Sequence, residues 1–474
     1  MGVFNNLVVF DQHARQSTLQ SIVPDLASEW SWDEGGTRLT LKLRQGVKWH
    51  DGAPFTAKDV VCTYDLLLEK SADKLRANPR KQVLKNLDRV TADGDFQVSF
   101  HLKRPQPAFM MLIAHGFAPI YPCHVPAAQM RQHPIGTGPF KFVEFKPNEV
   151  IRVTRNPDYW KPGLPYLDGI EYTVVRNPAT AVLAFLSGKF DMSFLNQLTV
   201  SLFRDVKSQL PQAICEQTPD GGVNRHLLIN RDLPPFNNPE LRRALTLTID
   251  RKAFVDIISE GEGAIGGVMQ PQPEGAWGLP PAELAKLPGY APDVAKNREE
   301  ARKIMRGLGY SPDNRLHVKV TTREIPLYRD PAVLLIDQLK EAYVDGELDV
   351  VDTSAYFPKI RRKDFALSLN AQTSGPDPDA VFELFYACGS PLNWDGYCNS
   401  EIDQLIEKQS LEADLGKRKQ VVWEIERRLA EEATRPIIFY GKGGTCWQPY
   451  VKNVSLMVDS IFNANRREDW WLDK

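Results

Sequence analysis

Hydrophobic and polar residues alternate in two stretches near the N-terminus. In TRLTLKLR (37–44) leucines occupy positions 39, 41 and 43, and FQVSFHL (96–102) repeats the period of two. Such alternation predicts half-buried β-strands. Between them, TAKDVVCTYDLLLEK (56–70) predicts a helix, because Thr56 and Asp59 have the spacing of a capping box and Val60, Tyr64 and Leu67 share one face.

The rest of the chain mixes single apolar runs with helical patterns. The predicted strands are IRVTR (151–155), HLLIN (226–230), HVKVTT (317–322) and PIIFY (436–440). Predicted helices begin at Asn238, which opens LRRALTLTIDRKAFVDIIS, at Asn297, which opens REEARKIMRGLG, and at Ser400, which opens EIDQLIEKQ. This order predicts the α/β class, in layers, rather than a sandwich or a helix bundle.

Composition limits the kind of partner. The 474 residues, 42% hydrophobic and 25% charged, are enough for more than one core, so we expect two or three domains. Basic and acidic residues number 58 and 60 without long blocks of one sign, which argues against binding to nucleic acid or an anionic membrane. A small neutral or zwitterionic molecule suits this surface better. The most apolar stretch, 109–121, is interrupted by His115, Gly116 and Pro119 and is too short to span a bilayer.

The six cysteines contain no Cys-x-x-Cys, which argues against a zinc knuckle or a thioredoxin-like site. If all are oxidised, fifteen pairings are possible. Cys388 and Cys398 enclose GSPLNWDGY, a loop of turn-forming residues that could bring them within bridging distance. The pairing of Cys62, Cys123, Cys215 and Cys446 stays open.

Short motifs for cofactors and metals are weak. GEGAIG (261–266) has dinucleotide-type spacing but follows a helical pattern instead of a strand, and GKGGT (441–445) lacks the phosphate-loop spacing and is better interpreted as a strand end. No His-Glu-x-x-His or Gly-x-Ser-x-Gly occurs. His124 and His133, which flank a Pro-rich turn, are expected to be ordinary surface histidines. We expect neither a cofactor nor a bound metal.

NAQTSGPDPD (370–379) is the most informative polar stretch. Pro376 and Pro378 break the alternating oxygen ligands that a calcium loop needs. Asp377 followed by Pro378 predicts a helix start leading into AVFELFYA. The polar residues before it, Asn370, Gln372, Thr373 and Ser374, are expected at a strand end and loop, where ligands of α/β sheets gather.

Several phrases, taken in order, resemble a known family. They are 22–61 (IVPDLASEW through KDVV), GTGPFKF (136–142), RNPDYW (155–160), 227–255 (LLINRDLPPFNNPELRRALTLTIDRKAFV), DPD (377–379) and NWDGYCNSEID (393–403). Together they are similar to the peptide-binding family, family 5, of extracellular solute-binding proteins of ABC transporters. That family includes dipeptide, oligopeptide and nickel binders.

The resemblance implies a two-lobed periplasmic-binding-protein fold that closes at a hinge over a cleft. Lobe I is expected at 1–225 with 441–474, including an extra subdomain at about 33–135, and lobe II at 226–440. The chain would cross between the lobes near 224–230 and 440–446. The resemblance also implies the Cys388–Cys398 disulfide, an extracytoplasmic location and an export signal upstream of Met1.

The resemblance further implies ligand contacts. Peptide-binding members hold the ligand's ammonium with an aspartate three residues before the Asp of the DP pair, and that position here is Ser374. A serine cannot neutralise a buried cation, so a peptide with a free N-terminus is disfavoured. Arg323, Tyr328 and Arg329 lie where relatives place an arginine for the ligand's carboxylate. Trp277, in the proline- and glycine-rich loop 266–292, and Trp394 are the expected aromatic walls.

The resulting hypothesis is a monomeric extracytoplasmic binding protein of an ABC importer, without catalytic activity. It would bind a peptide-like or other organic solute, with a carboxylate, through Asn370, Ser374 and one arginine, and deliver it to the membrane permease. A nickel-chelate binder or a sugar- or opine-type binder of the same fold is the alternative. A hydrolase using Asp377 and Asp379 as paired carboxylates is a weaker one.

Overall fold

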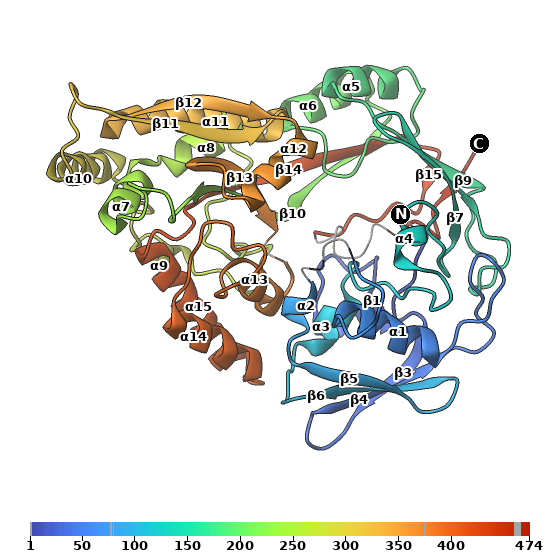
Figure 1. Cartoon of the computed structure of the whole chain (residues 1–474). Helices are drawn as coiled ribbons and strands as arrows, with labels where there is room; N and C mark the ends of the chain where they lie inside the picture. The colour runs from blue at the N-terminus through green and yellow to red at the C-terminus, as the bar shows by residue number, and fades with distance from the viewer. Residues whose placement is uncertain (1, 76–77, 79, 374, 459–465) are drawn as a thin grey trace. The chain divides into compact units, whose positions relative to one another are not determined.

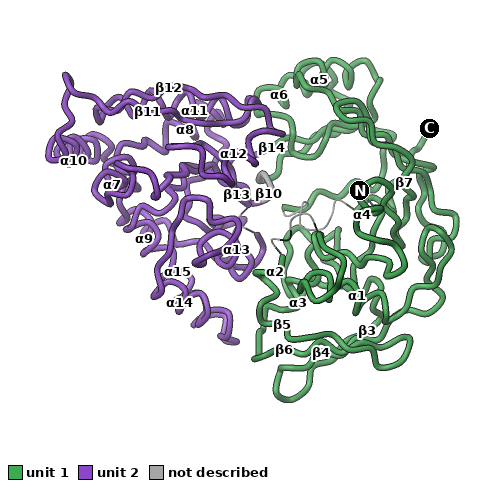
Figure 2. The backbone as a smooth tube through the Cα atoms, viewed as in Figure 1, with its two compact units in different colours: residues 1–218, 443–474 green, residues 219–442 purple. Residues whose placement is uncertain are grey.

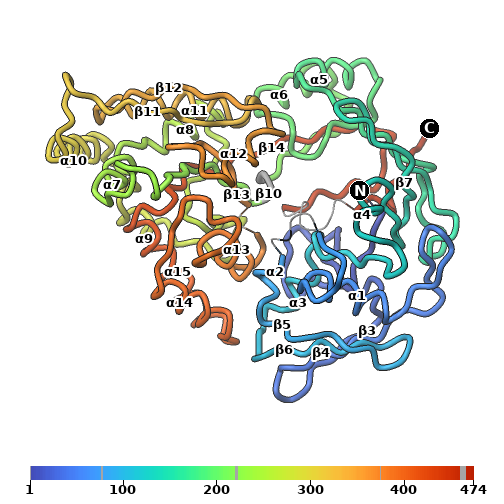
Figure 3. Tube along the Cα trace, in the orientation of Figure 1, coloured from blue at the N-terminus to red at the C-terminus, as the bar shows by residue number. Residues whose placement is uncertain are grey.

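The computed structural model describes residues 2–75, 78, 80–373, 375–458 and 466–474. The chain forms two compact units, residues 1–218 with 443–474 (unit 1) and residues 219–442 (unit 2), coloured separately in Figure 2. Strands β10 (Ile214–Ile229) and β14 (Ile437–Trp447) each run through a boundary between the units. The C-terminal segment thus returns to unit 1, as the red end of the trace in Figure 3 shows. The lobe boundaries expected from the sequence stay a prediction.

Unit 1 begins with the elements that the alternating pattern predicts. An antiparallel sheet has the order β3 (Ala27–Trp32), β4 (Arg38–Leu43), β6 (Gln97–Leu102), β5 (Leu87–Ala92). Helix α1 (Ala57–Leu67) packs against β5 and β6, with Val60, Tyr64 and Leu67 buried. The backbone N–H of Thr56 donates to Asp59 Oδ2 at 2.9 Å, which confirms the predicted helix start.

The remaining strands of unit 1 form small antiparallel sheets. They are β1 (Val8–Phe10) with β2 (Ile22–Pro24), β7 (Phe140–Lys146) with β8 (Val150–Arg155) and β9 (Gly169–Thr173), and β15 (Val451–Lys452) with β16 (Trp471–Leu472). The helices are η1 (Leu19–Ser21), α2 (Arg80–Val83), α3 (Phe109–Ala114), α4 (Ala127–Met130), α5 (Pro178–Leu186) and α6 (Val200–Gln209). Every residue of α3 is buried, so the first half of the most apolar stretch, 109–121, is a short core helix.

Unit 2 is built on a mixed five-stranded sheet in the order β12-β11-β13-β10-β14. Strand β11 (Leu316–Arg323) is parallel to β12 (Val344–Val351) and β13 (Leu367–Thr373), and β10 is antiparallel to β13. One face carries Leu227, Ile229, Leu367 and Leu369 into a core cluster of unit 2. Helices α7 (Pro239–Thr248), α8 (Arg251–Ile258), α10 (Val294–Gly307) and α11 (Pro326–Leu339) contribute to that cluster.

A second core of unit 2 is mainly helical. It joins α13 (Pro378–Phe385), α14 (Ser400–Leu411) and α15 (Leu415–Glu431), and α14 and α15 lie side by side in Figure 1. The other short elements are α9 (Pro281–Leu284), η2 (Lys340–Ala342) and α12 (Thr353–Arg361).

Four local predictions were wrong in whole or in part, and capping hydrogen bonds explain the three that concern helices. Helix α10 begins at Val294 because Asp293, and not Asn297, caps it by accepting from Lys296 N at 3.0 Å. Helix α14 begins at Ser400 as predicted, but the preceding residue, Asn399, caps it by accepting from Glu401 N. The segment after Asn238 is two helices, since Asp250 caps α8 separately. The glycines at 441–445 do not end a strand but lie inside β14.

All six cysteines are paired. The Cys388–Cys398 disulfide is confirmed, with a Cα–Cα distance of 4.6 Å. The pairs left open by the sequence are Cys62–Cys123 and Cys215–Cys446. The last pair joins β10 to β14 on the unit 1 side of both boundaries.

Candidate functional site

The parallel strands of unit 2 bring polar and aromatic side chains together at their carboxyl ends. Arg323 is the last residue of β11 and Thr373 the last of β13, and the two strands run in the same direction. Tyr328 follows on the first turn of α11. Because ligands of open α/β sheets bind beyond the carboxyl ends of the strands, this end of the sheet is the candidate site.

Arg323 is held by rings instead of by a carboxylate. Its guanidinium carbon lies 3.5 Å from the ring centroid of Tyr328, 5.3 Å from that of Phe357 and 5.7 Å from that of Tyr356. Its buried Nε has no hydrogen-bond acceptor among the described residues. The side chain is half-buried, so it combines a positioned cation with access to solvent.

The other arginines near Tyr328 have different surroundings. Arg225 is buried, lies 5.5 Å from the Tyr328 ring centroid and donates through Nε to the Leu327 carbonyl at 3.4 Å. Arg329 is exposed and pairs with the neighbouring Asp330 at 3.0 Å. Arg329 is therefore already neutralised at the surface, which distinguishes it from Arg323.

Asn370 lies opposite His226 in the β10–β13 ladder, and both side chains are buried. His226 Nδ1 and Asn224 Oδ1 are 2.9 Å apart. Burial, helped by the positive charges of Arg435 and Arg225, holds the pKa of His226 well below its usual value, so the ring is neutral. Asn370 Oδ1 and His226 Nε2 have no donor among the described residues. Both atoms can accept a hydrogen bond. Asn370 was predicted from the sequence as a site residue, and His226 was not.

The two aspartates of the DPD motif are fully engaged. Asp377 caps α13 by accepting from Asp379 N at 2.9 Å, which confirms the predicted helix start. Arg418 donates to both oxygens of Asp377, at 2.9 and 2.7 Å, and to Asp379 at 3.1 Å. Although burial lowers the pKa of Arg418, the two aspartates raise it above its usual value. Neither carboxylate is free for general acid or base chemistry.

A second buried ion pair of unit 2 joins Arg435 to Asp395. Arg435 donates to Asp395 at 3.1 Å and to Gln372 Oε1 at 2.6 Å. Arg435 and Asp395 are both almost fully buried. Asp395 is therefore neutralised as well, and the amide oxygen of Gln372 is occupied by Arg435.

The remaining predicted site residues have mixed surroundings. The ring of Trp277 lies 4.7 Å from the Arg418 guanidinium carbon, its N–H donates to Pro376 O at 3.1 Å, and only 9% of the residue is exposed. Trp394 is half-buried, and its ring centroid lies 6.0 Å from that of Phe357. Ser374 lies outside the described residues. Ligand contact by any of these residues stays a prediction.

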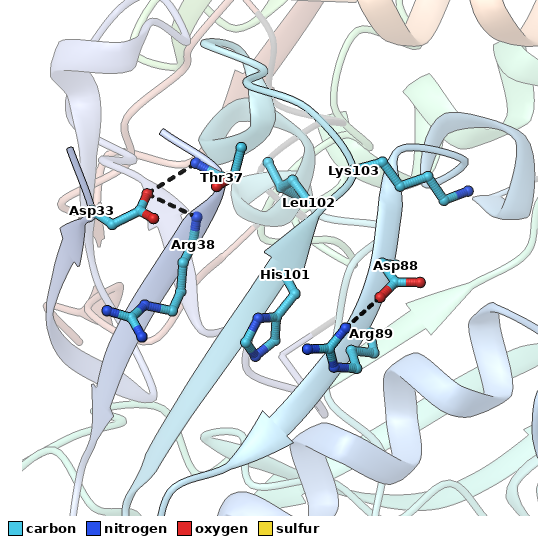
Figure 4. Close-up of a pocket in the computed structure, with 8 residues that line it drawn as sticks. All are labelled: Asp33, Thr37, Arg38, Asp88, Arg89, His101, Leu102 and Lys103. Carbon is cyan, nitrogen blue, oxygen red and sulfur yellow. Dashed lines mark hydrogen bonds and ion pairs between the residues drawn. The ribbon is translucent and has the colours of Figure 1, made fainter. Parts of the chain in front are cut away.

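Unit 1 has an open depression of about 750 Å³ on the solvent face of its four-stranded sheet (Figure 4). Arg38, His101 and Arg89 are in register across β4, β6 and β5. Asp88 pairs with Arg89 at 2.6 Å, and Asp33 accepts from the backbone N–H groups of Thr37 and Arg38. The side chains that line this depression are polar apart from Leu102, unlike the apolar walls of small-molecule pockets.

No group of three or more histidine, cysteine, aspartate or glutamate side chains within the described ranges is arranged to hold a metal ion. His124 instead contacts Asp51 at 2.7 Å at the surface. No helix in the part of the chain that the structure describes is long and apolar enough to cross a membrane.

Comparison with known proteins identifies the family. The model of the bacterial extracellular solute-binding proteins, family 5, matches residues 21–393. The chain belongs to this family. It is 25% identical over 472 residues to the oligopeptide-binding protein AppA of Bacillus subtilis (strain 168), covering 93% of this chain and 82% of that protein.

Solved structures share the fold. The dipeptide binding protein from pseudoalteromonas sp. SM9913, in complex with Met-Leu, gives a TM-score of 0.87 at 21% identity, covering 100% of this chain and 94% of that one. The protein AgaA from A. tumefacien R10, in complex with agropinic acid, gives 0.84 at 20% identity, covering 100% and 93%. The chain therefore has the two-lobed α/β fold of periplasmic binding proteins. The relatives are named as binding proteins, not as enzymes.

Proposed function

We propose that this protein binds a carboxylate-bearing organic solute outside the cytoplasm and delivers it to the permease of an ABC importer. The solute is peptide-like or opine-like and is enclosed between the two lobes, which close over it. Membership of a family of extracellular solute-binding proteins supports the general role. AppA is named as an oligopeptide-binding protein, and AgaA was solved with agropinic acid, so the fold suits both kinds of solute.

The proposal that the solute is acidic depends on which charged side chains of the candidate site are already paired. Arg418 neutralises Asp377 and Asp379, and Arg435 neutralises Asp395. Arg323 has aromatic neighbours and no ion pair to a described residue. Among the charged side chains buried near these strand ends, the three aspartates are thus paired whereas the half-buried Arg323 is not, which favours an acidic group on the solute over an ammonium.

Aromatic and amide groups supply the rest of the proposed pocket. Tyr328 holds the plane of the Arg323 guanidinium by stacking, so less conformational entropy is lost when a carboxylate binds. Trp394 is proposed as an apolar wall, and Asn370 with Ser374 as polar contacts to the solute's backbone-like groups.

Calorimetry with matched ligands tests the proposal. The set comprises a dipeptide, its N-acetyl form, its C-terminal amide and the N-acetyl amide. We expect the N-acetylated acid to bind at least as well as the free dipeptide, and both amides to bind weakly. Arg323→Met should weaken binding of the acid by about 30-fold or more, since a buried charge pair that loses one partner costs at least about 2 kcal/mol.

Arg329→Met is the matched control. It removes an exposed arginine of the same segment that already pairs with Asp330, and it should leave affinity within about threefold. Tight binding of the C-terminal amides, or equal effects of the two substitutions, would refute the carboxylate assignment. Retention of nickel by protein purified without chelators would favour the nickel-chelate alternative. Turnover of a peptide or glycoside panel would favour a hydrolase.

A further inference from the structure

The proline- and glycine-rich loop 266–292 is fastened to unit 2 by buried polar side chains. Glu426, on α15, accepts from the backbone N–H groups of Met269 at 2.7 Å and Leu279 at 3.0 Å. Arg251, on α8, donates to the carbonyls of Gly289 at 2.5 Å and Ile437 at 2.8 Å. The loop is therefore held by buried polar side chains from two different helices, Glu426 of α15 and Arg251 of α8.

Between these anchors lies a cavity of about 20 Å³. Its polar lining comes from Arg251, Arg435, Glu426, Tyr290 and Thr246, and apolar side chains such as Leu287, Leu429 and Ala430 complete it. A cavity needs roughly 10–15 Å³ of such volume to hold one water molecule, and this one has room for little more. An organic ligand is excluded by size.

The polar lining leaves a hydrogen-bond donor available. Arg251 is 3% exposed, and its Nη2 makes no well-aligned hydrogen bond to a described residue. Its guanidinium carbon lies 3.9 Å from the Tyr290 ring centroid, and Tyr290 stabilises the charge both through its ring and through a side-chain contact. Acceptors also line the cavity, namely the carboxyl group of Glu426 and the hydroxyl of Thr246.

We propose that this cavity is a specific binding site for one water molecule, which accepts a hydrogen bond from Nη2 of Arg251 and bonds to the Glu426 carboxyl group. Water both donates and accepts, as this mixed lining requires, whereas a halide ion only accepts. The bound water completes the fastening of loop 266–292 to α8 and α15. Burial raises the pKa of Glu426 to about 8, so near neutral pH its carboxyl proton also has an acceptor in this water.

A high-resolution crystal structure of the full chain, with a parallel bromide soak, tests the site. We expect one oxygen-sized density peak about 2.7–3.2 Å from Nη2 of Arg251, and no anomalous peak from bromide. A cavity without density, a peak out of hydrogen-bond reach of Nη2, or an anomalous bromide peak would each overturn the proposal.

Ala430→Val provides an independent test because it adds volume to the cavity wall. Displacing a bound water should lower the melting temperature by several degrees more than the control Ala295→Val, which places the same β-branched residue at an exposed position of α10. If the cavity is dry, filling it should instead raise the melting temperature relative to that control. Arg251→Met should abolish the density peak. If that variant does not fold, the crystal structure of the unaltered chain still decides.

Discussion

At the residue scale, arginines determine which charges of unit 2 are available to a ligand. Arg418 and Arg435 are buried against aspartates, whereas Arg323 is half-buried among rings. The helix start at Asp377 could be predicted from Asp-Pro. Its partner Arg418 could not, because it lies 41 residues further along the chain and nothing local marks the contact.

Arg418→Met is expected to destabilise unit 2 by about 3–5 kcal/mol, because it leaves Asp377 and Asp379 buried without a counter-charge. Arg428→Met, in the same helix, removes a more exposed arginine paired with Glu424 and Glu401 and should cost about 1 kcal/mol or less. Urea denaturation followed by circular dichroism measures both. Equal losses would mean that the Asp377–Arg418 cluster is not what holds the start of α13.

The buried carboxyl group of Glu426 should make stability depend on pH. Burial raises its pKa from the usual 4.5 to about 8, so the folded chain binds a proton that the unfolded chain releases. Stability is therefore greatest below about pH 4.5 as far as this group is concerned, and it falls as the pH rises toward 8. The slope approaches about 1.4 kcal/mol per pH unit within that window.

Glu426→Gln should flatten that slope, because glutamine does not titrate. Unfolding free energies of both proteins measured between about pH 5 and 8 provide the comparison. The variant will start from a lower value, since an amide cannot accept from both Met269 N and Leu279 N through two oxygens. A slope that survives the substitution would assign the pH dependence to other groups.

At the element scale, helices and strands could be predicted where the residues that determine them lie within the element itself. The strands β4 and β6 and helix α1 were predictable, because their periodicity and capping residues lie within the elements. Helix α10 was placed late because Asn297, a good capping residue type, donates to Ala291 O from inside the helix. The glycines of β14 looked like a strand end, since pairing with neighbouring strands cannot be inferred from 441–445 alone.

The disulfides differ in the length of chain that they close. Cys215–Cys446 encloses 231 residues and joins β10 to β14, whereas Cys388–Cys398 encloses 10. On the chain-entropy model, replacing both cysteines by alanine should cost roughly 5 kcal/mol for the first pair and roughly 3 kcal/mol for the second. Chemical denaturation of C215A/C446A and C388A/C398A measures this order. A larger loss for the short loop would show that local packing, rather than loop closure, sets the contribution.

At the scale of the whole molecule, the order of motifs along the chain was enough to identify the family and the two-lobed fold. The phrases between 22 and 403 are individually modest, but their spacing reflects a common topology. The solute was not predictable to the same degree. Its recognition depends on which of several charges stay unpaired after folding, and Ser374, the residue that prompted the choice of an acidic solute, lies outside the described residues.

Native mass spectrometry of freshly purified protein tests whether this chain binds a carboxylate-bearing solute, since a binding protein that closes over its solute tends to retain it. We expect a one-to-one adduct that is released intact on unfolding and carries at least one carboxylate, and we expect Arg323→Met to lose it while Arg329→Met keeps it. A released solute with only basic groups, or one chemically altered by the protein, would contradict the account.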